Sequence, residues 1–150
     1  MKAKQVLTIA AALSSASGIA WASDWRLVEV SSTKATAVEM STVVHSDGRA
    51  TAWTAMMLPL TVSGMDYALS LAEYDCEART TKPLSVVWYD GGGQLVTRSD
   101  LAGPAVASGD KPTESLILKA VCTNEFVKDG DISWATALSL FRMYRNIPAT

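Results

Sequence analysis

The sequence predicts an α+β fold, in which a single domain is mainly an antiparallel β-sheet with one or two helices packed on it and one disulfide. Three observations predict this fold. Short segments alternate apolar and polar residues along most of the chain, with the period of two that a half-buried strand requires. Turn residues such as Asp47-Gly48 and Gly91-Gly92-Gly93 separate these segments. Finally, the chain holds two cysteines, Cys76 and Cys122, and begins with a segment typical of export.

The first 22 residues have the three parts of a secretory signal peptide. Lys2 and Lys4 precede an uncharged run rich in Ala and Leu, and small residues then lead to Ala20-Trp21-Ala22. The alternatives are a membrane anchor or a core helix, and the apolar run is shorter than the ~20 residues that a spanning helix needs. We therefore expect export to the periplasm or cell surface, with cleavage after Ala22 or, as the alternative, after Ala20. Residues 23–150 would then form a single domain without a membrane span.

Cleavage changes the formal net charge from −2 to −4, because it removes two of the 13 basic residues and none of the 15 acidic ones. A mildly acidic surface disfavours nucleic-acid binding, which needs a basic patch. In an oxidising compartment, two cysteines with none left over predict a disulfide between Cys76 and Cys122, and buried free thiols are the alternative. Closing a loop of this length contributes about 4 kcal/mol in the chain-entropy model.

The first half of the mature chain predicts three strands and a tight hairpin. Residues 25–30 and 35–46 alternate, and Asp47-Gly48 favours a type I′ turn because Asp and Gly tolerate positive φ. Residues 49–58 return from that turn, and Pro59 is expected to end the strand. The residues expected on one face of the second strand are Val38, Met40, Thr42 and Val44, and those on one face of the third are Trp53, Ala55 and Met57.

The middle of the chain predicts three further strands. Residues 66–78 read as a strand, although their Ala, Leu and Glu content also tolerates helix. Residues 83–90 are β-branched and aromatic, and residues 94–100 are expected to pair with them across the three glycines. The alternative for the glycines is a phosphate cradle, which would require a helix directly after them, and none is predicted there.

Two helices are expected in the last third, after a loop at residues 101–111. Pro112 or Thr113 can begin the first, which runs to Cys122, although a short strand is also compatible. The second lies within residues 131–146, capped by Asp131 or Ser133 and ending before Pro148. The residues that form a stripe along one face of it are Trp134, Ala137, Leu138, Phe141 and Arg145. Such a stripe usually covers a sheet, and the alternative is a partner-binding face.

The residues offer little for catalysis. His45 is the only histidine, so it cannot complete a zinc site with disulfide-bonded cysteines, and no G-x-S-x-G elbow is present. Glu73, Asp75 and Glu77 would share one strand face, where Arg79 and Lys82 can screen them; a glycosidase-like acid/base pair is the alternative reading. Trp88 and Tyr89 would point to opposite faces and so form no stacking platform. We expect no catalytic, cofactor-binding or metal-binding residues.

Several of these residues recur in the order and spacing of a known pattern. They are Trp25, Glu39, Thr42, Gly48, Trp53, Asp75, Cys76, Arg79, Leu84, Tyr89, Asp90, Gly93, Pro112, Ser115, Val121 and Cys122. Over about residues 25–122 the chain resembles the surface-adhesin protein E family of bacterial secreted proteins. It departs from the family in having Glu39 where Asp is more usual, in lacking an aromatic residue before Pro112, and in extending over residues 123–150 with a predicted helix.

The resemblance implies an antiparallel sheet with a helix against it and a non-enzymatic protein-binding role. The implied partner is a host matrix protein or an envelope protein, and the family offers no catalytic residue to transfer. A sheet face or edge is the expected contact surface, and the stripe through Trp134, Leu138 and Phe141 is the rival. Two other classes stay open: a structural or accessory protein of the envelope, and a small secreted enzyme.

Overall fold

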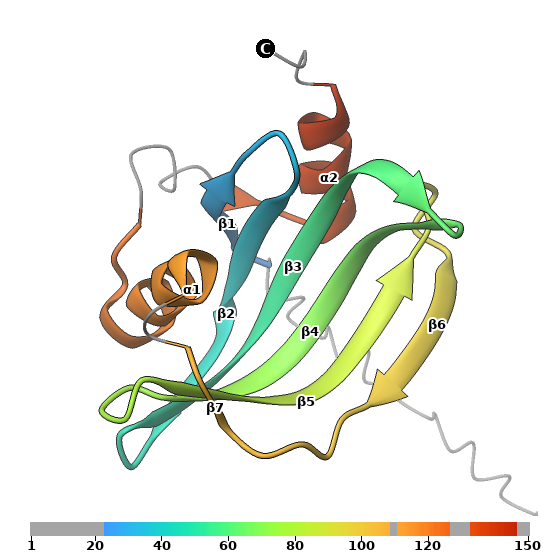
Figure 1. Cartoon of the computed structure of the whole chain (residues 1–150). Coiled ribbons are helices and arrows are strands. Elements are labelled where there is room, and N and C mark those ends of the chain that lie inside the picture. Colours follow the sequence, from blue (N-terminus) through green and yellow to red (C-terminus); the bar gives the residue numbers. More distant parts are fainter. Residues whose placement is uncertain (1–22, 109–110, 127–132, 147–150) are drawn as a thin grey trace, which may run out of the picture.

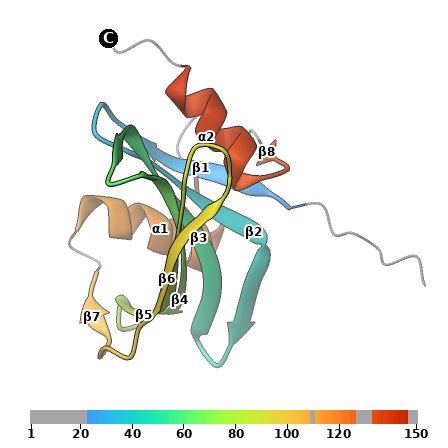
Figure 2. The same cartoon turned by 90° about the vertical axis from the view of Figure 1, so that its right-hand side faces the viewer.

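The computed structural model describes residues 23–108, 111–126 and 133–146, which form one antiparallel sheet with a helix on each face (Figures 1 and 2). The strands lie in the order β6-β5-β4-β3-β2-β1-β8, and β7 pairs with β5 beside β6. This arrangement confirms the predicted α+β fold class. The strands are β1 (Trp25–Val30), β2 (Ala35–Ser46), β3 (Arg49–Val62), β4 (Met65–Asp75), β5 (Thr80–Tyr89), β6 (Leu95–Asp100), β7 (Val106–Ala107) and β8 (Ser133–Trp134), and the helices are α1 (Pro112–Thr123) and α2 (Ala137–Arg145).

The predicted hairpin between β2 and β3 is present. Asp47 and Gly48 have φ of 50° and 75°, the left-handed conformations that a type I′ turn requires. The β3–β4 hairpin uses the same device, with φ of 52° at Ser63 and 76° at Gly64. Serine supports a turn more weakly than Asp or Asn does, so this second turn depends more on the strands that flank it.

A β-bulge in β2 changes the predicted face of its second half. The register with β3 shifts between Glu39 and Val44, and the Thr42 hydroxyl donates to the Glu39 carbonyl at 2.8 Å. Because a bulge inserts an extra residue, the alternation changes phase beyond it. Val43 therefore packs with Val38 and Met40 in the core, and Val44 is 62% exposed. The expectation that Val44 shares a face with Val38 is wrong.

Three strand boundaries also differ from the sequence prediction. β3 continues to Val62 instead of ending at Pro59, because the register with β4 shifts between Met57 and Val62 and accommodates the proline there. β4 ends at Asp75 and not at Ala78, since a turn follows in which Arg79 has φ of 55°. β5 begins at Thr80, and the loop expected at residues 101–111 contains the short strand β7.

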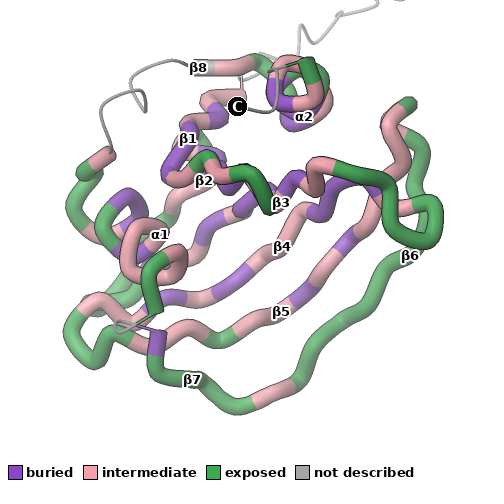
Figure 3. The backbone as a smooth tube through the Cα atoms, turned by 45° about the horizontal axis from the view of Figure 1, so that its top comes forward, coloured by how far each residue is buried: buried purple, intermediate pink, exposed green. Residues whose placement is uncertain are grey.

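The two faces of the sheet carry separate cores, visible as buried residues along the central strands in Figure 3. One core packs under α2 and the other under α1. This division follows from the period-two alternation of β2 and β3, which sends neighbouring residues to opposite faces. The buried residues under α2 include Trp25, Leu27, Ala55, Met57, Tyr67, Leu140 and Phe141, and those under α1 include Val28, Val38, Ala52, Tyr74, Leu118 and Val121.

Helix α1 begins at Pro112, as predicted, with Glu114 in its first turn. Proline suits this position because the first helical N–H has no intrahelical partner. The helix ends at Thr123, and its C-cap residue Asn124 has the left-handed conformation. Cys122 lies in the last turn of the helix. A disulfide joins Cys122 to Cys76 in the turn after β4, with Cα atoms 5.8 Å apart. It fixes the end of α1 to the sheet.

Helix α2 is shorter than predicted and begins later. Thr136 caps it by accepting the Ser139 N–H at 3.0 Å, so the expected cap at Ser133 is wrong. Ser133 and Trp134 instead form β8, which pairs with Arg26 and Trp25 of β1. Trp134 therefore belongs to the sheet and not to the helical stripe. The other proposed cap, Asp131, and the stop at Pro148 lie outside the described residues.

The apolar face of α2 covers the sheet, which decides between the two readings of the stripe. Phe141 is 4% exposed and stacks on Tyr67, with ring centroids 5.2 Å apart. Arg145 lies over the Phe141 ring, forms an ion pair with the buried Asp66 and donates to the Leu58 carbonyl at 2.9 Å. This end of α2 is therefore held by both packing and charge.

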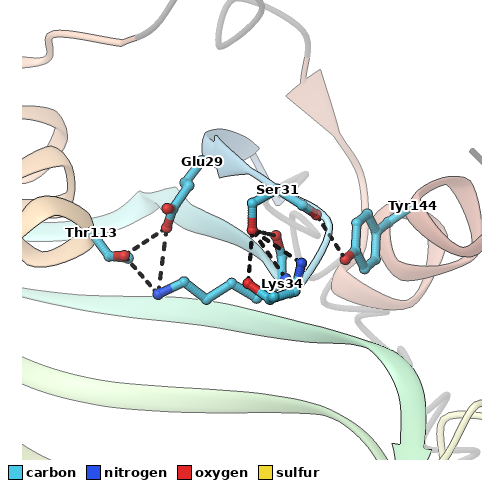
Figure 4. A network of polar contacts seen from close by, with 6 residues as sticks. Glu29, Ser31, Lys34, Thr113 and Tyr144 are labelled. Atoms are coloured by element: carbon cyan, nitrogen blue, oxygen red, sulfur yellow. Dashed lines mark hydrogen bonds and ion pairs between the residues drawn. The ribbon is translucent and has the colours of Figure 1, made fainter. Parts of the chain in front are cut away.

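A polar network at the β1–β2 turn contacts both helices (Figure 4). Thr113 of α1 accepts from the Lys34 ammonium and donates to the Glu29 carboxylate, both at 2.6 Å. On the other side, the Tyr144 hydroxyl of α2 donates to the Ser31 carbonyl at 3.3 Å. The β1–β2 turn thus helps to position both helices on the sheet.

Candidate functional site

Strand β6 is exposed along its whole length and lies at one edge of the sheet (Figures 1 and 3). All six of its residues are exposed, and within the described residues only β5 pairs with it. Its sequence, LVTRSD, gives two apolar residues and then four polar ones, without the alternation of a half-buried strand. That departure was a signal of low burial, which the sequence reasoning did not use.

The register between β5 and β6 determines which backbone N–H groups of β6 point away from the sheet. The N–H of Leu101 donates to the Leu84 carbonyl at 2.8 Å, and Ser99 pairs with Val86 in the same register. In an antiparallel ladder every second residue exchanges hydrogen bonds with the partner strand. The N–H groups of Ser99 and Thr97 therefore point toward β5, whereas that of Arg98 points outward and can bond to another strand.

Apolar side chains are exposed along the same edge. Leu95 is 60% exposed and Val96 is 42% exposed, both at the start of β6. Leu101, which directly follows β6, is also exposed. Val106 is exposed too, and it lies in β7, which pairs with β5 as β6 does. A partner that pairs with the outward backbone of β6 would meet these side chains. We call Leu95–Asp100, Leu101 and Val106 the β6 edge.

The predicted acidic cluster is occupied by ion pairs. Arg49 lies 3.3 Å from Glu73 and 3.6 Å from Asp75, so one guanidinium pairs with both of the carboxylates that do share a strand. Glu77 lies in the turn after β4, because the strand ends at Asp75, and is exposed. Lys82 is opposite Glu73 in the register, whereas Arg79 points to Ser115 of α1 at 3.5 Å. The cluster is a solvated, paired surface.

The other residues considered for chemistry are dispersed. His45 is exposed near the end of β2 and faces Ala50 in the register. Trp88 and Tyr89 point to opposite faces, as expected: Tyr89 stacks on Tyr67 at 5.1 Å, and Trp88 is opposite Ala68. Within residues 23–108, 111–126 and 133–146, no group of three or more potential metal ligands is found.

The most perturbed titratable side chains are buried tyrosines. Burial beneath α1 strongly raises the pKa of Tyr74, against a smaller lowering by the hydroxyl of Thr54. Burial also raises the pKa of Tyr67, and the neighbouring Tyr89 and Asp90 raise it further. A neutral phenol with a raised pKa is a poor base at pH 7, so these groups serve packing.

The sequence did not predict that the carboxylate of Glu39, in β2 opposite the first residue of β1, would be buried. Glu39 is 3% exposed, and one of its oxygens accepts the Asp24 N–H at 2.6 Å and the Ser41 hydroxyl at 2.7 Å. The other oxygen, Oε2, is buried and has no hydrogen-bond partner among the described residues. The only signal in the sequence was that Glu39 and Thr42 belong to the adhesin-like pattern. Both turn out to hold the β2 bulge and the start of β1.

The three-glycine loop packs against α2. The φ of Gly93 is 86°, and a Cβ placed there would lie 3.0 Å from the Leu138 side chain. At Gly91 a Cβ would lie 3.4 Å from the Asp66 carboxylate and 3.6 Å from the Phe141 ring. The loop is therefore a hairpin connection, as predicted, with the additional role of letting the backbone approach the helix.

Comparison with protein families shows which family this chain matches. A family model described as surface-adhesin protein E matches residues 25–123, which is more than half of the chain. No curated protein matches the chain, and no solved structure matches it. Neither helix of the described residues has the length and apolarity that crossing a bilayer requires.

Proposed function

Because this chain belongs to the surface-adhesin protein E family, we propose that it is an exported, non-enzymatic module that binds a protein partner by pairing with the β6 edge. The partner is a host matrix protein or an envelope protein. Residues 1–22 are removed on export, and residues 23–150 form one domain at the cell surface or in the periplasm. The family match supports the adhesin-like role, and the exposed β6 edge is the observation that carries the mode of binding.

Strand addition suits this edge for two physical reasons. The outward backbone groups of β6 can supply directional hydrogen bonds to an extended peptide, and Leu95 and Val96 supply apolar area beside them. The alternative surface on α2 is unsuitable, since Leu140 and Phe141 are buried on the sheet. Arg98 and Asp100 pair with each other at 3.1 Å, which leaves this part of the edge without net charge.

The substitution Arg98→Pro tests this mode of binding, because it removes one outward N–H and leaves the hydrogen bonds between β6 and β5 intact. The domain should stay folded, because edge strands tolerate proline where the N–H faces away from the neighbouring strand. Arg98→Ala is the matched control for the lost charge. Ser99→Pro removes an N–H that points toward β5 and should instead destabilise the hairpin.

The purified mature domain is first used to capture partners from envelope extract and, separately, from host matrix proteins. We expect a partner that binds the native domain and Arg98→Ala alike and loses binding to Arg98→Pro. Equal binding by Arg98→Pro would refute pairing at this edge. Failure of the native domain to capture any partner would refute the adhesive role and favour an accessory role in the envelope. Turnover of a substrate that is abolished on changing His45 or Glu73 would refute the non-enzymatic reading.

A further inference from the structure

We propose that Glu39 forms a binding site for the new amino terminus that export creates. The structure assigns to the Glu39 carboxylate the α-ammonium group of Ser23, which exists only after cleavage behind Ala22. The proposal goes beyond partner binding and concerns how the mature chain is held together. It rests on the proposed export, but its test does not depend on where the cell cuts the chain.

The Glu39 carboxylate has one unsatisfied buried oxygen. Glu39 is 3% exposed, and its Oε2 has no hydrogen-bond partner in the part of the chain that the structure describes. An ionised carboxylate buried with a free oxygen is costly, because it loses hydration without replacement. Oε1 already accepts two hydrogen bonds, from the Asp24 N–H and the Ser41 hydroxyl. The site therefore lacks one donor, and a cationic donor would also neutralise the buried charge.

Ser23 lies directly before the residue that already binds Glu39 through its backbone. The Asp24 nitrogen is 2.6 Å from Oε1 of Glu39, and its backbone is fixed from the other side because its carbonyl accepts the Met40 N–H at 2.8 Å. The Ser23 nitrogen is three covalent bonds from the Asp24 nitrogen, which keeps the two within about 4 Å. Cleavage after Ala22 would thus create an ammonium group next to the carboxylate, with three donors free to rotate toward Oε2.

Neighbouring side chains in the sheet surround the Glu39 carboxylate. Glu39 lies between Trp25 and Trp53 in the sheet register, so apolar neighbours limit access of water. Two further charged groups belong to the same segment, Asp24 and Arg26, and they form an ion pair at 2.9 Å. Before cleavage, the Ser23 nitrogen is an uncharged amide with a single N–H. The same carboxylate would therefore stabilise the start of β1 more in the mature chain than in the precursor.

The experiment compares two forms with defined amino termini, residues 23–150 and residues 22–150, each released from a fusion by a protease that cuts directly before the first residue. All described elements lie within both forms. The α-amino pKa is measured by NMR titration of the first carbonyl carbon. We expect Ser23 to titrate at least about one unit above the usual ~7.7–8.0, because a nearby carboxylate favours the ammonium form. Ala22 in the longer form should titrate in the usual range.

Stability provides a second readout. An amino group whose pKa is raised by folding stabilises the domain fully below its unfolded pKa, and the effect is lost as the pH rises through the folded pKa. The form beginning at Ser23 should therefore melt higher than the form beginning at Ala22 at pH 7, and the difference should shrink above about pH 9. Glu39→Gln should abolish the difference in both readouts, whereas Glu77→Gln, which removes an exposed carboxylate, should leave it unchanged.

An ordinary α-amino pKa at Ser23, or equal melting of the two forms at pH 7, would overturn the proposal. A Glu39 carboxyl carbon that reports a protonated acid at pH 7 in the Ser23 form would also overturn it. If Glu39→Gln fails to fold, the comparison of the two native forms still decides. An exported protein whose mass shows cleavage elsewhere would contradict the cleavage position, and the recombinant Ser23 form would still show whether the site binds an ammonium group.

Discussion

Replacing Phe141 by alanine removes the ring through which α2 packs on the sheet. The side chain is 4% exposed, stacks on Tyr67 and lies under the Arg145 guanidinium, so the substitution creates a cavity and removes both ring contacts. Burial of this kind is worth about 3–5 kcal/mol for Phe→Ala. The glycine loop approaches the same ring, with the Cβ position of Gly91 only 3.6 Å away, and its backbone cannot collapse far into the space. We therefore expect a loss of about 4 kcal/mol.

Urea unfolding of the mature domain, followed by tryptophan fluorescence, measures this loss. With a slope of about 2 kcal/mol per M for a domain of this size, the midpoint should fall by about 2 M. Leu95→Ala is the matched control, because Leu95 is 60% exposed and its removal should change stability by less than about 0.5 kcal/mol. A loss of less than about 1 kcal/mol for Phe141→Ala would refute the packing of α2 on the sheet and return the stripe to the candidate binding surfaces.

Three further predictions follow from the loop, the disulfide and the buried tyrosine. Gly93→Ala should destabilise the domain by about 1–2 kcal/mol in the same urea assay. Alanine is strained at φ of 86°, and its Cβ would lie too close to Leu138. Unchanged stability would mean that the loop does not approach α2. Replacing Cys76 and Cys122 together by serine should cost about 2–5 kcal/mol, and the native, unreduced protein should take up no thiol reagent after unfolding, as mass spectrometry can show. Tyr74, whose pKa burial raises, should stabilise the fold below the unfolded pKa of about 10 and lose that effect as the pH rises above it. Absorbance titration, taken as the difference between the native domain and Tyr74→Phe, should therefore show the ionisation of Tyr74 together with alkaline unfolding, whereas Tyr74→Phe should unfold at higher pH. A Tyr74 phenol that titrates near pH 10 while the domain stays folded would contradict its burial.

Local signals determined much of the fold. The type I′ turn at Asp47-Gly48 depends on two residues that tolerate positive φ, and α1 starts at a proline that suits the first helical position. The period-two alternation of β2 and β3 depends only on neighbours in the chain, and so the strands and the fold class could be predicted from it. The cysteine pair could be predicted for a different reason, since two cysteines leave one possible bond within a chain that is expected to be exported.

The remaining features depend on partners that are distant in the sequence. The β2 bulge is held where Thr42 contacts the Trp53 backbone, and Trp134 joins the sheet because β1 offers it an edge, so neither can be recognised from nearby residues. Glu39 resembles a polar strand residue in the sequence, yet the chain around Asp24 and Trp25 buries it. The free edge at β6 likewise arises from the order of the strands. Hydrogen bonds between residues far apart in the sequence require the assembled sheet, and this is why only the tertiary structure decided the candidate sites.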